Sequence, residues 1–123
     1  MNSRDIVVDN DQITIELSNL EKILSFHPSF KISFSQITEI SDTLLPPIWK
    51  EIRAPGIAFP GIKTGTYYTS RGKEFWLLRI KDNPVRIELQ NNKFKRLILG
   101  IKDHEKWLFT IKELRKKVSD HRK

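Results

Sequence analysis

The spacing of apolar residues changes once along this chain, and that change restricts the fold more than any other feature. Between residues 12 and 101, apolar side chains alternate with polar ones in several short runs, which is the period of a half-buried β-strand. From residue 107 onward they recur every three or four positions, as in an amphipathic helix. We therefore expect a mainly β chain with one C-terminal helix.

The alternating runs are short and are separated by turn signals such as Asn91-Asn92 and Asp82-Asn83-Pro84. The run EFWLLRI carries apolar residues on both faces, so we expect a central strand that is covered on both sides. About six or seven short strands at regular spacing indicate a small barrel or a sandwich. The expected strands are residues 12–18, 30–34, 37–41, 65–70, 74–80, 85–90 and 95–101. A short helical turn is expected at 19–28 and an irregular segment at 48–63.

The last segment shows the signals of a helix of about fifteen residues. Asp103 is a suitable N-cap and Glu105 falls in the first turn, where an acidic side chain stabilises the helix dipole. Arg115, Lys116 and Lys117 are expected in the last turn. One stripe of the helix is apolar, and we expect it to pack on the sheet, with its tryptophan filling the open end of the barrel. The stripe consists of Trp107, Ile111, Leu114 and Val118.

A length of 123 residues indicates one domain with its own core. We expect an N-terminal extension at 1–11, the domain at 12–118 and a basic tail at 119–123. The chain has no cysteine, no apolar run at its start and no long apolar segment, so we expect a cytoplasmic protein. Its net charge is +7, and the basic residues are concentrated toward the C-terminus.

The central stretch RAPGIAFPGIKTG has the ingredients of a phosphate-binding loop, because Gly56 and Gly61 are spaced as in such loops. However, Lys63 comes one position late, Pro60 removes a backbone donor, and a strand-forming sequence follows where a helix is required. We expect these glycines, together with Gly65, to serve the fold by adopting positive φ or by allowing close backbone packing.

Catalytic and metal-binding patterns are not found in the sequence. The three histidines, His27, His104 and His121, fall in different expected elements, and no paired-histidine or serine-elbow motif occurs. Carboxylates at several positions could meet in space only through the fold. They are Asp42, Glu51, Glu74, Asp82 and Glu88. We therefore expect neither an enzyme nor a cofactor-binding or metal-binding protein.

Two sets of residues are candidates for binding. The first is basic and would bind an anionic lipid surface or a nucleic acid, unless the residues lie apart on an ordinary solvated surface. It comprises Lys93, Lys95, Arg96, Arg115, Lys116 and Lys117. The second consists of Tyr67 and Tyr68, neighbours on an expected strand, of which one must face outward and can contact a protein partner. Phe75 and Trp107 are expected in the core.

Four stretches together resemble the pleckstrin-homology-like (PH-like) domains of small uncharacterised bacterial proteins. They are LSNLEKILSFHPSFKISFSQI, RAPGIAFPGIKTGTYY, EFWLLRI and VRIELQNNKFKRLILGIKD, of which the second is the most specific. The resemblance implies a bent, seven-stranded antiparallel barrel capped by the C-terminal helix, without catalytic activity and without a settled ligand. Eukaryotic relatives often bind phosphoinositides through the loop after the first strand. Here that loop, residues 19–28, has one lysine, Lys22, beside Glu21.

From the residues and the resemblance together, we expect a non-enzymatic binding or scaffold domain that recognises protein. A homodimer through uncovered strand edges is one form of that expectation. Peripheral binding of anionic lipid or nucleic acid through the basic residues is the alternative.

Overall fold

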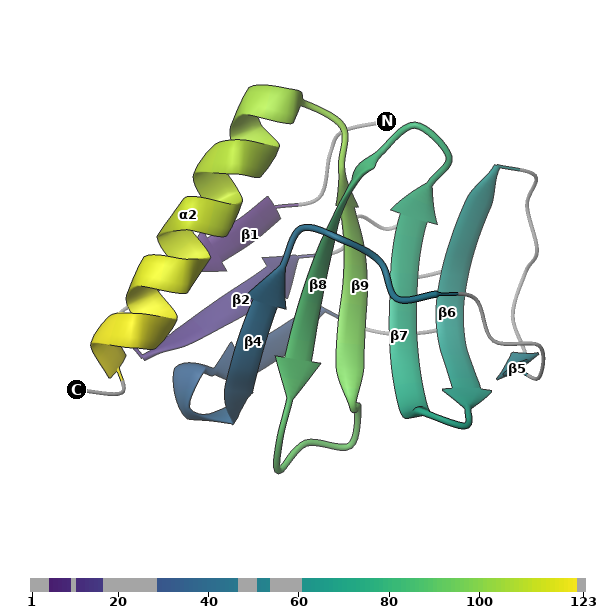
Figure 1. Cartoon of the computed structure of the whole chain (residues 1–123). Helices are drawn as coiled ribbons and strands as arrows, with labels where there is room; N and C mark the ends of the chain where they lie inside the picture. The colour runs from purple at the N-terminus through teal and green to yellow at the C-terminus, as the bar shows by residue number, and fades with distance from the viewer. Residues whose placement is uncertain (1–4, 10, 17–28, 47–50, 54–60, 122–123) are drawn as a thin grey trace.

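The computed structural model describes residues 5–9, 11–16, 29–46, 51–53 and 61–121 (Figure 1). This described part is mainly β and ends in one long helix, as predicted. Its strands are β1 (Asp5–Val8), β2 (Gln12–Glu16), β3 (Phe30–Ser33), β4 (Ile37–Ser41), β5 (Glu51–Arg53), β6 (Ile62–Thr69), β7 (Gly72–Arg79), β8 (Asn83–Leu89) and β9 (Arg96–Ile101). The short 3-10 helix η1 (Phe34–Gln36) joins β3 to β4, and the long helix is α2 (His104–His121).

The strands form two sheets, and neither closes into a barrel. One sheet has the order β1-β2-β3, and the other has the order β4-β8-β9-β7-β6-β5. Of the two expected alternatives, the antiparallel barrel is therefore wrong for the described residues, whereas two separate sheets agree with a sandwich. The reason is the position of β9, which pairs with β8 on one side and lies parallel to β7 on the other. This insertion extends the sheet instead of closing it, and it leaves β4 at one end of the strand order.

The core lies between the two sheets and α2, on what we call the inner face of the six-stranded sheet. Three phenylalanine rings join the sheets there in edge-to-face contacts. Phe30 of β3 lies 4.6 Å from Phe75 of β7, and Phe94, just before β9, lies 5.8 Å from each of them, measured between ring centres. All three rings are buried, so the prediction for Phe75 is confirmed.

Helix α2 begins as predicted, at Asp103. The carboxylate of Asp103 accepts a hydrogen bond of 2.9 Å from the backbone N–H of Lys106, which satisfies one of the free donors of the first turn. The helix is 18 residues long and continues to His121, so Arg115 to Lys117 precede its last turn instead of forming it. The expected length of about fifteen residues was therefore too short.

The apolar stripe of α2 packs on the core as predicted, except at its first residue, Trp107. Ile111, Leu114 and Val118 are buried, as predicted. Trp107 is only half-buried, and its indole Nε1–H donates a 2.6 Å hydrogen bond to the carbonyl of Pro84. Because there is no closed barrel end to fill, the tryptophan packs at the rim of the core, against the start of β8.

The seven predicted strands correspond to β2, β3, β4, β6, β7, β8 and β9. Two further strands were not predicted. β1 lies in the segment assigned to an extension, and β5 lies in the segment expected to be irregular. The helical turn expected at 19–28 falls outside the described residues. Gly61 and Gly65 have φ of 76° and 108°, which confirms the conformational role expected for them.

After β4 the chain crosses the second face of the six-stranded sheet, which we call the outer face (Figure 1). On this crossing, the carbonyl of Thr43 accepts a 3.0 Å hydrogen bond from Nε of Arg86. Leu44 lies further along and lines a hollow together with Trp76 and Pro84. The outer face is therefore partly covered, which is why charged strand residues on it are buried.

Candidate functional site

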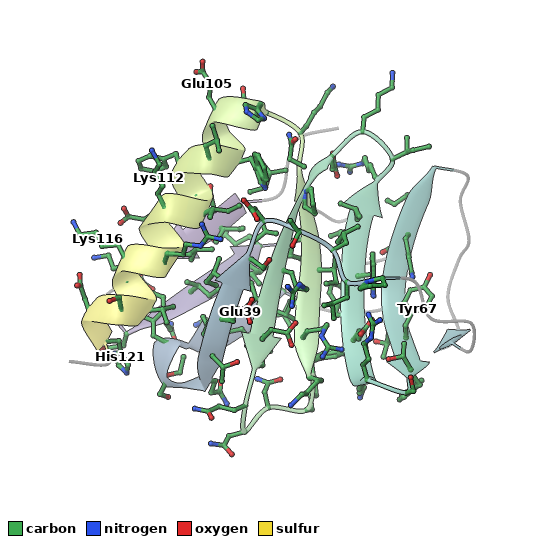
Figure 2. All side chains as sticks on the ribbon, viewed as in Figure 1. Glu39, Tyr67, Glu105, Lys112, Lys116 and His121 are labelled. Atoms are coloured by element: carbon green, nitrogen blue, oxygen red, sulfur yellow. The ribbon has the colours of Figure 1, made fainter. Side chains whose placement is uncertain are left out.

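The outer face carries an ion-pair network that spans four neighbouring strands. The strand register assembles it, because Glu39 of β4 lies opposite Glu88 of β8, and Arg96 of β9 lies between Glu88 and Glu74 of β7. Arg86 of β8 completes the network. Figure 2 shows the side chains and labels Glu39 at the β4 end of the network.

Arg96 is the centre of this network. Its Nη1 lies 2.5 Å from Oε2 of Glu74, and its Nε lies 3.0 Å from Oε2 of Glu88. Arg86 contacts Glu88 at 2.6 Å and reaches Glu39 at 3.6 Å. The other carboxylate oxygen of Glu74 accepts a 2.9 Å hydrogen bond from the indole N–H of Trp76. Arg96 and Glu74 are 6% and 4% exposed, so this ion pair lies in a low-dielectric environment.

The network holds two of its members, Glu88 and Arg96, in their charged forms. Burial alone would raise the pKa of Glu88, but hydrogen bonds and charge attraction from Arg96 and Arg86 outweigh it and leave that pKa below its ordinary value of 4.5. For Arg96, burial acts to lower the pKa, but hydrogen bonds and charge attraction from Glu88 and Glu74 raise it above its ordinary value. Groups held this firmly as ions are suited to structure, not to proton transfer near neutral pH.

The sequence singled out several carboxylates, and two of them, Glu74 and Glu88, do come together in the structure. They lie on either side of the Arg96 guanidinium, which compensates their negative charge. The two described histidines lie at opposite ends of α2, where the ring of His104 lies tilted against that of Trp107 and His121 lies near Phe34. Within the described residues, no group of three histidine, cysteine, aspartate or glutamate side chains is placed to hold a metal ion.

Beside the network, the outer face has a hollow of about 380 Å³ lined mainly by apolar side chains, which come from β6, β7, the start of β8 and the crossing after β4. Lys63 lies at its edge, with its ammonium 3.8 Å from the ring centre of Trp76 and 4.6 Å from that of Tyr67. Sequence reasoning missed this contact because Lys63 and Trp76 become neighbours only through the β6–β7 register. The arrangement fixes the lysine over the aromatic rings.

A second groove runs between the edge strand β4 and α2. It has a volume of about 250 Å³ and is lined by Thr38, Glu39, Ile40, Arg115, Val118 and Ser119. Strand β4 pairs with β8 on one side, and its other side faces this groove. The carbonyl of Ile40 points into it and accepts a 3.2 Å hydrogen bond from Nε of Arg115. Because the N–H and C=O of one strand residue point the same way, the amide of Ile40 also faces the groove.

The six predicted basic residues do not form one surface in the structure. Lys93 and Lys95 are exposed at the β8–β9 connection, whereas Arg96 is buried in the ion-pair network and cannot contact a ligand at the surface. Arg115 lies at the β4 groove, and Lys116 points away from the sheets (Figure 2). Lys117 is half-buried. The hypothesis of one patch from all six residues is wrong for Arg96 because the register places it between two carboxylates.

The tyrosines behave as adjacent strand residues must, with one facing each way. Tyr67 is 9% exposed and lies edge-on to Trp76, with the ring centres 6.4 Å apart. Tyr68 is 47% exposed and is the one of the pair that is available to a partner.

Among the described residues, no helix combines the length and the apolar character needed to cross a membrane. Comparisons of the chain with protein-family models, with curated proteins and with solved structures each gave no match. The resemblance to PH-like domains therefore rests on the sequence stretches that suggested it.

Proposed function

We propose that this chain is a non-enzymatic protein-recognition module that binds an extended segment of a partner along β4, in the groove against α2. The observation that supports this proposal best is the side of β4 that faces α2, where the Ile40 carbonyl bonds to the side chain of Arg115 and, among the described residues, no further strand pairs with β4. A strand edge that no other strand covers is a template for another strand, and many proteins use such an edge for recognition.

The groove supplies both parts of such recognition. Main-chain pairing with the N–H and C=O of Ile40 provides affinity independently of sequence, and the side chains of the groove select among partners. When a bound strand takes the Ile40 carbonyl, the guanidinium of Arg115 is free to pair with a carboxylate of the partner. Because Glu39 also lines the groove, we expect a preference for one acidic residue placed opposite Arg115, not for a run of acidic residues.

The proposal is tested by selecting peptides from a random-sequence phage library on the immobilised chain. The selected peptides are then added to isotope-labelled protein, and amide chemical shifts are followed by NMR. We expect the shifts to concentrate in β4 and in the second half of α2. Shifts confined to other surfaces, or failure to select any peptide that binds here, would contradict the proposal.

A matched pair of variants sharpens this test. Ser119 lines the groove, so Ser119→Trp should fill it and abolish peptide binding. Asp120 is the next residue and is also exposed, but it does not line the groove, so Asp120→Trp should leave binding unchanged. Equal affinity of the two variants would place the peptide elsewhere.

A second copy of this chain is the alternative partner for the same edge, because two β4 strands can pair antiparallel about a two-fold axis. Light scattering coupled to size-exclusion chromatography separates the alternatives. A dimer that Ser119→Trp dissociates would make self-association the function of the groove. A monomer at high concentration would exclude it.

A further inference from the structure

Two turns that are far apart in the sequence meet at one end of the six-stranded sheet (Figure 1). One joins β6 to β7, and the other joins β8 to β9. They meet because β7 and β9 are parallel, so both strands start at the same end. The backbone N–H of Lys95 donates a 2.7 Å hydrogen bond to the carbonyl of Lys73. Gly72 permits the contact, since a Cβ there would lie 3.0 Å from Cβ of Lys95.

The two turns bring four cations together. Arg71 and Lys73 come from the first turn, and Lys93 and Lys95 come from the second. Neither turn, SRGK at 70–73 or QNNKFK at 90–95, contains an acidic residue. Among the described residues, no carboxylate forms an ion pair with any of the four. The result is a concentration of positive charge at the two turns, with one acidic residue, Glu51 of β5, opposite Thr69 on the neighbouring strand. Such a concentration attracts phosphates.

An exposed aromatic ring lies beside these cations. Tyr68 is 47% exposed, and the ammonium of Lys73 lies 5.7 Å from its ring centre. The same ammonium lies 5.1 Å from the ring centre of the buried Phe94, and that of Lys93 lies 5.4 Å from it. Both ammonium groups therefore lie near Phe94 at the edge of the core, and that of Lys73 also lies near Tyr68. We call the set of Tyr68, Arg71, Lys73, Lys93 and Lys95 the turn patch.

We propose that the turn patch binds single-stranded nucleic acid. An exposed aromatic ring among cations suits a single strand, because an unpaired base can stack on the ring while the neighbouring phosphates contact the basic groups. A membrane surface fits less well, because the turns carry the polar residues Ser70, Asn91 and Asn92, and no apolar side chain from them is available to enter a bilayer. The turn patch is separate from the β4 groove, so the two proposals fail or succeed independently.

Fluorescence anisotropy with a labelled oligonucleotide of roughly twelve thymidines tests the proposal. If four cations contact phosphates, the logarithm of the binding constant should fall with the logarithm of salt concentration with a slope of about −2.8. Lys93→Gln with Lys95→Gln should weaken binding and reduce that slope to about −1.4. The matched control, Lys112→Gln with Lys116→Gln, removes the same charge from α2 and should leave the slope unchanged.

Two substitutions of Tyr68 test the stacking. Tyr68→Ala should weaken binding by about 5- to 150-fold, the range for losing one stacked base, whereas Tyr68→Phe keeps the ring and should bind as the original chain does. Because the side chain is exposed, both variants should fold, which circular dichroism checks.

Several results would overturn the proposal. One is the absence of oligonucleotide binding at about 50 mM salt, where phosphate contacts are strong. Another is an equal loss of affinity in the α2 control pair, which would show a response to net charge alone. Unchanged binding by Tyr68→Ala would also overturn it, as would binding to phosphatidylserine vesicles without binding to the oligonucleotide.

Discussion

Replacement of Arg96 by methionine tests the ion-pair network of the outer face. Methionine follows the arginine side chain only as far as the Nε position, and it removes the guanidinium that contacts Glu74 at 2.5 Å and Glu88 at 3.0 Å. Arg96 and Glu74 are almost fully buried. Removing one partner of a buried ion pair leaves an uncompensated charge and costs about 3–5 kcal/mol of unfolding free energy. For a domain of this size, that is a large fraction of the total.

The loss of unfolding free energy in Arg96→Met should become smaller as the pH falls. In the original chain, the pKa of Glu88 in the folded state lies below 4.5, so the stability that it contributes is complete above pH 4.5 and is lost as the pH falls through the folded value. In Arg96→Met the main partner of Glu88 is gone while its burial remains, so its pKa rises. As the pH falls through that raised value, the variant takes up a proton and the stability difference between the two proteins shrinks.

Urea unfolding near pH 7 and near pH 5 measures both effects. Lys112→Met, an equivalent change at an exposed position of α2, should alter the unfolding free energy by no more than about 0.5 kcal/mol. Arg96→Lys keeps the positive charge but loses the forked geometry of the guanidinium. Its unfolding free energy should therefore lie between those of Arg96→Met and Lys112→Met, and it should remain folded even if Arg96→Met does not. A loss below about 1 kcal/mol for Arg96→Met, or a loss that does not change with pH, would refute the reasoning.

Three further substitutions test contacts that position the elements. Trp107→Ala should cost about 2–4 kcal/mol in urea melts, less than for a fully buried tryptophan because the ring is half-exposed, while Lys112→Ala should stay within about 0.5 kcal/mol. Gly100→Ala would place a methyl group on the carboxylate of Asp82 and should lower the thermal midpoint by the equivalent of about 1–3 kcal/mol or more. Gly72→Ala, at a φ of 114°, should cost about 1–3 kcal/mol and weaken oligonucleotide binding, because the two turns separate.

The elements that the sequence predicted correctly are those whose signal is local. In β8, the residues Val85, Ile87 and Leu89 alternate with polar ones, and all three are buried as that alternation requires. In α2, the cap at Asp103 and the apolar stripe from Ile111 onward are likewise readable within a few turns of chain. Such patterns indicate which side of a strand or helix faces the core, but they do not indicate which other elements form that core.

The features that were missed depend on pairing between distant segments. The apolar residues of β7 and β9 indicate buried strands whether or not the two are neighbours, so their parallel contact left no local signal in the sequence. Strands β1 and β5 are only four and three residues long, too short for a period to be recognised. The position of Trp107 at the rim follows from the open sheet, because a closed barrel was the assumption behind its expected burial.

The ion-pair network and the turn patch both follow from the pairing of β9 with β7 and β8. In the run KRLILGI, Lys95 and Arg96 are adjacent basic residues, and the sequence alone does not indicate which of them is exposed and which is buried. Because adjacent strand residues point to opposite faces, the start of β9 sends Arg96 between Glu88 and Glu74 and leaves Lys95 against Gly72 at the turn. A shift of one residue in that register would expose Arg96 and bury Lys95 among the carboxylates. The ion-pair network thus fixes the register of β9, and that register in turn presents Lys93 and Lys95 beside Lys73 at the turn patch.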